Sequence, residues 1–245
     1  MPSDQHLRLY ADLATWWPVF SPPSHYVEEA QDLLPTLLAA PDAPPRNMLE
    51  LGSGGGSLAF HFKTHLELTL SDISPEMLAI SGRVNPECEH VQGDMRRLDL
   101  GRTFDLVFIH DAIMYMLDQA SVRAALATAY RHCRPGGAVV VVPDCVRETF
   151  EPATSHGGED EPGGRGLRYL EWTWDPDRND DTCEVAFAFL LREPDGTVHV
   201  DSDHHQFGLF ARQAWLDWLR ETGFVPETRM DPWNRDVFTG RKRRN

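Results

Sequence analysis

Hydrophobic positions along the 245-residue chain fall into short unbroken runs and into helically spaced series. Between residues 46 and 144, each apolar run typical of a buried strand is followed by a turn, or by a segment in which apolar residues recur every three or four positions. The expected strands are 46–51, 66–72, 88–94, 104–111 and 136–144, and the expected helices are 57–64, 74–86 and 118–133. This order predicts an α/β fold with a doubly wound, mostly parallel sheet.

The flanking segments follow different patterns. Apolar spacing over 7–38 predicts two helices ahead of the core, interrupted at "PVFSPPS". A Gly-, Pro- and acid-rich loop is expected at 151–166, followed by antiparallel strands with a hairpin turn at Pro194-Asp195-Gly196. A helix ending at Gly223 and two strands complete the pattern. We expect a single domain over 1–245, divided into a helical lid (1–40), a ligand-binding core (46–144), a loop and antiparallel insertion (145–210), and a final helix with a strand pair (211–245).

Composition narrows the classes of protein. A hydrophobic fraction of 41% indicates a globular chain, and a formal net charge of -15 disfavours binding to nucleic acid. The N-terminal segment has no signal-peptide pattern and no apolar run is long enough to cross a membrane, so we expect a cytoplasmic protein without a membrane partner. The cysteines have no CxxC spacing, which argues against a structural zinc site or a disulfide framework.

The stretch "NMLELGSGGGSLAFHF", which begins at Asn47, carries the first candidate chemistry. Gly52, Gly54 and Gly56 follow the first core strand, so a ligand could approach the backbone N–H groups without meeting a Cβ atom. Asp72 lies 20 residues after Gly52 and could hold ribose hydroxyls. These residues alone also suit a nicotinamide dinucleotide.

Five ordered segments resolve this ambiguity: "LELGSGGG", "LSDISPEML", "VQGDMRRL", "FDLVFIHD" and "RPGG". Together they resemble the class I S-adenosylmethionine-dependent methyltransferases. The layout of the whole chain further resembles small-molecule N-methyltransferases of the amino-sugar and glycine type. The resemblance implies a Rossmann-like, seven-stranded sheet and S-adenosylmethionine as the cofactor.

The family pattern assigns roles residue by residue. Glu50 would face the methionine ammonium, Asp72 would accept hydrogen bonds from both ribose hydroxyls, and Asp94 would accept from the adenine amino group. His110 would contribute its carbonyl near the sulfonium. The full set of cofactor contacts implied by the resemblance is Glu50, Gly52, Gly54, Gly56, Asp72, Ile73, Asp94, Met95, His110 and Tyr26.

The acceptor side is defined less sharply. Tyr10, Tyr115 and His205 are the candidate catalytic residues, with Tyr115 at a place where some amino-sugar enzymes carry a histidine. Trp16, Trp17 and Trp172 are candidates for an aromatic wall around a methyl acceptor. We also weighed a metal site in "VHVDSDHHQF", but a hydrogen-bonded strand or a substrate-facing histidine explains the segment better, so no metal is predicted.

The sequence therefore predicts a methyltransferase that acts on a small molecule by in-line methyl transfer, with an amine favoured over a hydroxyl as the acceptor. Three alternatives remain: a small-molecule O-methyltransferase, an NAD(P)-dependent oxidoreductase, and a non-catalytic cofactor-binding protein. The tryptophans make a homodimer a further expectation.

Overall fold

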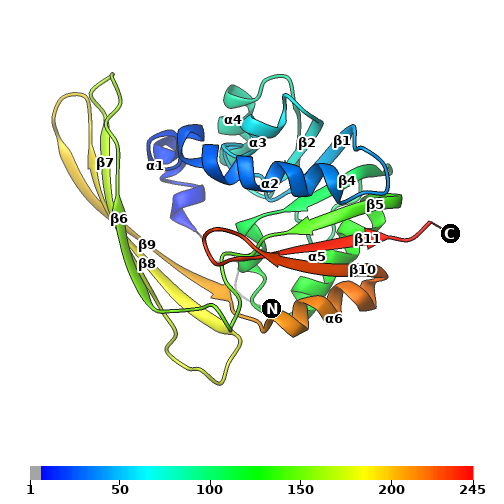
Figure 1. The fold of residues 1–245 in the computed structure, drawn as a ribbon. Coiled ribbons are helices and arrows are strands. Elements are labelled where there is room, and N and C mark those ends of the chain that lie inside the picture. The colour runs from blue at the N-terminus through cyan, green and yellow to red at the C-terminus, as the bar shows by residue number, and fades with distance from the viewer. Residues whose placement is uncertain (1–6, 245) are drawn as a thin grey trace.

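The computed structural model describes residues 7–244, which form two β-sheets with helices around the larger one (Figure 1). The seven-stranded sheet has the order β10-β11-β5-β4-β1-β2-β3, and a separate four-stranded sheet has the order β6-β7-β8-β9. Strands β1 to β5 are parallel, while β11 runs antiparallel to both of its neighbours. The predicted doubly wound α/β sheet is confirmed.

The core elements occur close to the expected positions. The strands of the larger sheet are β1 (Asn47–Leu51), β2 (Glu67–Asp72), β3 (Glu89–Gln92), β4 (Phe104–Ile109), β5 (Cys133–Val141), β10 (Phe224–Met230) and β11 (Asp236–Lys242). Its helices are α2 (Val27–Ala39), α3 (Ala59–Phe62), α4 (Pro75–Val84), α5 (Gln119–His132) and α6 (Arg212–Thr222), with the 3-10 turn η4 (Asp111–Tyr115) after β4. Gly223 ends α6 at a φ of 111°, as its position in the sequence predicts.

Two hydrophobic clusters cover the two faces of the larger sheet. Alternate residues of β1, β4 and β5 face opposite ways, and most of them are buried because helices cover both sides. On one face they pack with α5 and α6 around Trp215 and Leu126. On the other face they pack with α2 and α3 around Phe62 and Leu33. These two layers hold the carboxyl ends of the parallel strands at one edge, where the glycine loop begins after β1.

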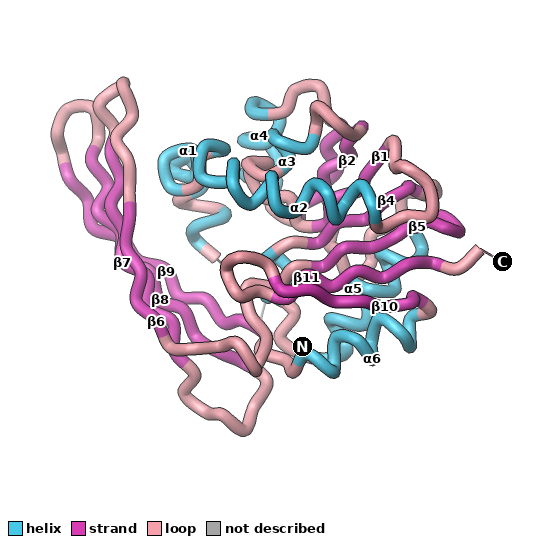
Figure 2. Tube along the Cα trace, viewed as in Figure 1, coloured by secondary structure: helices cyan, strands magenta, loops and turns pink. Residues whose placement is uncertain are grey.

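The insertion forms a long antiparallel sheet beside the core (Figures 1 and 2). Its strands are β6 (Ala153–Gly157), β7 (Gly166–Trp174), β8 (Thr182–Arg192) and β9 (Val198–Gly208). The expectation of an unstructured loop over 151–166 was wrong in part, because residues 153–157 pair with β7 as an edge strand. This segment is polar and exposed, so it has no buried face, and its hydrogen bonds to β7 satisfy the backbone groups on one side only.

The N-terminal lid differs from the expected pair of regular helices. Its first half is a series of short turns, namely η1 (Arg8–Tyr10), η2 (Ala14–Trp16) and α1 (Trp17–Phe20). The reason is tertiary, because the Leu9 N–H donates to Asp203 in β9 at 2.7 Å instead of continuing a helix. The second half, η3 (Pro23–Tyr26) followed by α2, follows the prediction more closely.

The "RPGG" segment belongs to the strand, which begins at Cys133 and not at the expected residue 136. The chain passes from α5 directly into β5 at Cys133, and the pairing with β4 shifts register between Phe104 and Leu106. The segment is therefore a bulge at the start of the strand. Within residues 7–244, no helix is long and apolar enough to cross a membrane.

Candidate active site

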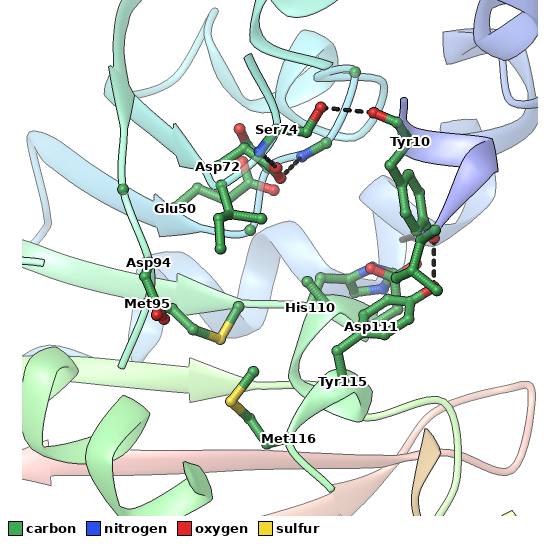
Figure 3. Close-up of a pocket in the computed structure, with 18 of the residues that line it drawn as sticks. Tyr10, Glu50, Asp72, Ser74, Asp94, Met95, His110, Asp111, Tyr115 and Met116 are labelled. Atoms are coloured by element: carbon green, nitrogen blue, oxygen red, sulfur yellow. Dashed lines mark hydrogen bonds and ion pairs between the residues drawn. The ribbon is translucent and has the colours of Figure 1, made fainter. Parts of the chain in front are cut away.

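A pocket of about 400 Å³ opens at the carboxyl ends of the parallel strands, where ligands bind in open α/β sheets (Figure 3). Its walls come from the glycine loop, the ends of β2, β3 and β4, the turn η4, and the lid. Tyr10 and Trp17 from the lid lie on the side nearest the insertion sheet. The pocket thus brings together segments that are far apart in the sequence.

The glycine loop is held by Asp72 and covered by Trp17. Gly54, at a φ of 52°, donates its N–H to Asp72 Oδ2 at 2.8 Å, while the Ser74 N–H donates to Oδ1 at 2.9 Å. At Gly55, a Cβ atom would lie 2.3 Å from the indole of Trp17, so only glycine allows the ring to lie against the loop. No role was predicted for Gly55 from the sequence, although four glycines within five positions, one more than the predicted loop uses, were a signal.

Glu50 lies at the base of the pocket with one oxygen unpartnered. Its side chain is buried, and Oε2 has no hydrogen-bond partner among the described residues. Burial raises the pKa of the Glu50 carboxyl to about 8, although the charge of His110 opposes this shift. An ammonium group placed against Oε2 would supply the missing hydrogen bond and favour the charged form of Glu50.

His110 participates through its side chain as well as its backbone. Its Nε2 lies 2.6 Å from Glu29 Oε1, and its Nδ1 lies 3.3 Å from Asp111 Oδ1. Burial alone would lower the pKa of His110, but Asp111 and Glu29 raise it well above the ordinary value. Arg235 also contacts Glu29 Oε1 at 2.6 Å. The sequence analysis assigned only the His110 carbonyl, and it missed this buried network because Glu29 and Arg235 are 206 residues apart.

The opposite end of the pocket is suited to an adenine. Ile73 is 59% exposed and lines the pocket next to Met95, so an apolar surface is available for a flat ring. The Asp94 carboxylate binds the Arg96 guanidinium, with Nη2 to Oδ2 at 2.8 Å. Burial would raise the pKa of Asp94, but the hydrogen bonds from Arg96 lower it. An amino group at Asp94 would therefore share this carboxylate with Arg96.

The three candidate catalytic residues meet in one hydrogen-bonded chain. The Tyr115 hydroxyl donates to the Tyr10 hydroxyl at 2.8 Å and lies 2.8 Å from Nδ1 of His205. Nε2 of His205 lies 2.9 Å from Asp203 Oδ2. Burial raises the pKa values of both tyrosines well above the ordinary value, so each keeps its hydroxyl proton near neutral pH.

Two of the three candidate substrate tryptophans do not line the pocket. Trp16 is buried within the cluster that joins the lid to the insertion sheet, and the Arg165 guanidinium lies 4.0 Å from the centre of its ring. Trp172 is 52% exposed and pairs in register with Ala186, on the sheet face opposite His205. Neither ring lies where the acceptor wall was predicted. For Trp172 the reason is that strand alternation shows which side chains share a face but not which face meets the pocket.

Tyr26 and Trp17 do line the pocket. The Tyr26 hydroxyl lies 2.6 Å from Ser21 Oγ, and Trp17 Nε1 is buried without a hydrogen-bond partner among residues 7–244. The sequence analysis did not commit to several other lining residues, such as Ser53, Asp111, Met116, Asp118 and Gln206. In the described part of the chain, no group of three or more His, Cys, Asp or Glu side chains could hold a metal ion.

Comparison with known proteins agrees with this geometry. A family of methyltransferase domains matches residues 48–137. A dTDP-3-amino-3,6-dideoxy-α-D-glucopyranose N,N-dimethyltransferase of Streptomyces fradiae is 30% identical over 221 residues, covering 88% of this chain and 84% of the relative. A dTDP-3-amino-3,4,6-trideoxy-α-D-glucopyranose N,N-dimethyltransferase of Streptomyces venezuelae is 28% identical, covering 88% of this chain and 90% of the relative.

Solved structures lead to the same family. DesVI of Streptomyces venezuelae superposes with a TM-score of 0.80 at 25% identity, covering 89% of this chain and 92% of DesVI. CalS10, an amino pentose methyltransferase from Micromonospora echinaspora solved with S-adenosylmethionine bound, gives a TM-score of 0.75 at 25% identity, covering 89% of this chain and 91% of CalS10. The unpartnered Glu50 oxygen and the glycine cradle fit this cofactor. The chain belongs to the class I S-adenosylmethionine-dependent methyltransferases.

Proposed function

We propose that this enzyme methylates the amino nitrogen of a small amino sugar. The observation that carries the proposal is the charge of the pocket. Its described lining contains the carboxylates Glu50, Asp72, Glu76, Asp94, Asp111 and Asp118, against only Arg96 and His110 as basic groups. An excess of carboxylates favours cationic ligands and raises the pKa of an amine held nearby. The amino-sugar relatives support the same acceptor class.

In this proposal the cofactor lies along the ends of β1, β2 and β3. Glu50 would pair with its ammonium, Gly52 and Gly54 would allow close approach of its amino acid portion, and Asp72 would accept from its ribose. Gly56, the third predicted glycine, lies against Ser81 and Asn85 and does not line the pocket. Ile73, Asp94 and Met95 enclose the adenine, and Tyr26 and His110 border the opposite end. S-adenosylmethionine supplies an electrophilic methyl group on a sulfonium. Tyr10 and Tyr115, which line the same pocket, would then be left to contact the acceptor.

The chain's own residues then act mainly by positioning. Trp17 covers the loop, and Tyr10 and Tyr115 form a wall that excludes water from the reacting groups. Holding a nucleophile in line with a methyl group in a dry pocket supplies much of the acceleration of a displacement reaction. A neutral amine needs no strong base to attack, whereas a hydroxyl would need one, and neither tyrosine ionises readily.

A matched pair of acceptors tests the proposal. The rate of S-adenosylhomocysteine formation should be measured with dTDP-3-amino-3,6-dideoxy-α-D-glucopyranose and with the counterpart that carries a hydroxyl in place of the amine. We expect turnover with the amine at least about a hundredfold faster, because a neutral amine attacks without a base whereas a sugar hydroxyl needs a strong one. Equal rates, or turnover of the hydroxyl compound alone, would contradict amine methylation.

We also infer a homodimer that forms through the outer face of the insertion sheet. Leu170, Trp172, Leu190 and Val200 are exposed there, on strands whose opposite face is buried. Two copies carry a net charge of -15 each and repel one another elsewhere, whereas the centre of this face has no carboxylate. Packing of one sheet face on its copy would bury these side chains. Light scattering should give the mass of a dimer, and Leu190→Asp should give a monomer; a monomeric wild-type protein would refute the interface.

A further inference from the structure

We propose that His205 receives, through Tyr115 and Tyr10, the proton that the acceptor amine gives up, and that Asp203 positions the imidazole for this task. The proposal rests on the amine methylation proposed above and adds a route for the proton.

The geometry of the chain is continuous from the pocket to the interior. Tyr10 and Tyr115 line the pocket, and their hydroxyls are 2.8 Å apart (Figure 3). The Tyr115 hydroxyl lies 2.8 Å from Nδ1 of His205, and Nε2 of His205 lies 2.9 Å from Asp203 Oδ2. Every link is of hydrogen-bond length, so a proton can pass along it without movement of a heavy atom.

His205 lies behind the tyrosines, where it is only 1% exposed. The rings of Tyr10, Tyr115 and Phe187 lie within 5.8 Å of its ring, centre to centre, and Phe207 lies at 6.1 Å. This aromatic enclosure separates the imidazole from solvent, so Tyr115 is its connection to the pocket.

Asp203 is fixed on both oxygens. The Leu9 N–H donates to Oδ2 at 2.7 Å and the His204 N–H donates to Oδ1 at 3.0 Å. Burial would raise the pKa of Asp203, but the hydrogen bonds from His205 and Leu9 lower it, so the carboxylate is charged near neutral pH. A carboxylate on Nε2 keeps a hydrogen on that nitrogen and leaves Nδ1 to exchange a proton with Tyr115.

The chemistry of an amine acceptor creates the need for such a route. The carboxylate-rich pocket stabilises an ammonium, which has no lone pair for attack. After attack, the acceptor nitrogen has used its lone pair for the new N–C bond, the electron pair of the broken C–S bond stays on sulfur, and the nitrogen carries one proton too many. Proton loss is therefore required before a neutral or twice-methylated amine can form.

The hydrogen-bonded chain accepts this proton. Tyr10 oxygen takes the proton from nitrogen, the Tyr10 hydroxyl proton passes to Tyr115, and the Tyr115 proton passes to His205 Nδ1. The result is an imidazolium beside the Asp203 carboxylate, with both tyrosines again neutral. In this loaded state Nδ1 donates to Tyr115 and Tyr115 donates to Tyr10, whereas before the transfer both hydrogen bonds run the other way. The same chain returns the proton after product release.

Other groups near His205 do not replace this path. Glu171 on β7 has an electrostatic interaction with the imidazole, and it accepts a hydrogen bond from Ser155 Oγ at 3.1 Å. Phe187 on β8 presents only an apolar ring. The titratable partners of His205 are thus Asp203, Tyr115, Tyr10 and, at longer range, Glu171.

The test compares Asp203→Asn with Asp201→Asn as a matched control. Asp201 also ties the lid to β9, since Arg8 Nη2 donates to its Oδ2 at 2.9 Å, but it lies outside the relay. With dTDP-3-amino-3,6-dideoxy-α-D-glucopyranose as the probe acceptor, kcat should be measured across the range from about pH 6.5 to about pH 9.5. Asp203→Asn should lose about tenfold or more at low pH and recover as the pH rises, because free amine then becomes abundant. Asp201→Asn should keep the wild-type pH profile.

The outcomes distinguish a failure of the proton relay from a failure of the proposed amine methylation. If the wild-type enzyme methylates no amine, amine methylation fails; if it does and the Asp203→Asn profile is parallel to the wild-type profile, the relay alone fails. An NMR measurement on ¹⁵N-histidine-labelled enzyme, assigned with His205→Gln, checks the tautomer without any acceptor. Neutral His205 should carry its hydrogen on Nε2, and Tyr115→Phe should shift the Nδ1 resonance. A hydrogen on Nδ1 in the neutral form would overturn the proposal even if Asp203→Asn does not fold.

Discussion

The wild-type enzyme should release a proton when S-adenosylhomocysteine binds, and Glu50→Gln should abolish this release. Burial raises the pKa of Glu50 to about 8, so the carboxyl is mostly protonated near pH 6.5 in the ligand-free enzyme. An ammonium against Oε2 needs the charged carboxylate. At about 1.4 kcal/mol per pH unit, ionising Glu50 near pH 6.5 costs about 2 kcal/mol of binding free energy.

The same shift fixes the sign of the pH dependence. Binding of S-adenosylhomocysteine should release close to one proton near pH 6.5, and affinity should rise up to about tenfold per pH unit until about pH 8. Folding stability should respond in the opposite direction. The folded state holds a proton that the unfolded state has lost, so the contribution of Glu50 to stability falls as the pH rises from about 4.5 to about 8.

Calorimetric titration with S-adenosylhomocysteine in buffers of different ionisation enthalpy measures the released proton directly. Glu50→Gln should release none, bind about tenfold or more weakly at pH 8, and melt at a higher temperature than wild type at that pH without ligand. Glu76→Gln, a carboxylate at the pocket edge, is the matched control and should keep the proton release. An unchanged proton release in Glu50→Gln would refute the reasoning.

Further predictions concern the lid and the buried ion pairs. Gly55→Val should weaken S-adenosylhomocysteine binding about tenfold, as judged by thermal shift, because its Cβ would meet the Trp17 indole; adding Trp17→Ala should restore part of the loss. Trp17→Ala should raise the acceptor KM severalfold. Trp172→Ala should leave the acceptor KM unchanged as long as the variant still dimerises, and equal effects on KM would contradict the placement of the two rings. Glu29→Gln should lower the free energy of unfolding at pH 7 by about 3 kcal/mol in chemical denaturation, because it leaves the buried Arg235 without one of its charge partners. Burial would raise the pKa of Glu29, but His110 and Arg235 lower it to about 2. The contribution of the charged Glu29 to folding stability is therefore lost as the pH falls from about 4.5 toward 2. A Glu29→Gln variant whose stability falls with acid as in the wild type would argue against the Glu29–Arg235 pair.

Most of the residues predicted to hold the cofactor line one pocket, because this half of the site is local in the sequence. Gly54 and Asp72 are 18 residues apart across one strand–helix–strand unit, and the strand ends place them together wherever the sheet forms. The pattern of glycines followed by an acidic residue therefore predicts that these residues lie close together. Gly55 was missed because its constraint comes from Trp17, which belongs to another segment of the chain.

The acceptor half depends on contacts between distant segments. Tyr10 and Tyr115 are 105 residues apart and Tyr115 and His205 are 90 apart, so their types suggested chemistry but not that they touch. Asp203 was considered only as part of the segment "VHVDSDHHQF". Similarly, period-2 alternation placed Trp172 on one face of a strand, and only the packing of the lid against the other face shows which of the two meets the pocket.

Tertiary contacts also changed local structure in ways that propensity does not show. The lid sequence around Leu9 has helical spacing, yet hydrogen bonding to β9 leaves it as short turns. The polar residues 153–157 have no strand pattern, yet an open sheet edge at β7 recruits them. In both cases a partner strand from the insertion decides the outcome.

The central claim is methyl transfer from S-adenosylmethionine to an acceptor nitrogen, and the position of a labelled methyl group tests it most directly. The enzyme should be incubated with S-adenosylmethionine carrying a ¹³C-methyl group and with dTDP-3-amino-3,6-dideoxy-α-D-glucopyranose, and the product examined by ¹³C NMR and mass spectrometry. We predict that the label is found on the amino nitrogen of the sugar. A label on a sugar oxygen, or an unmethylated sugar although the cofactor binds, would contradict the account.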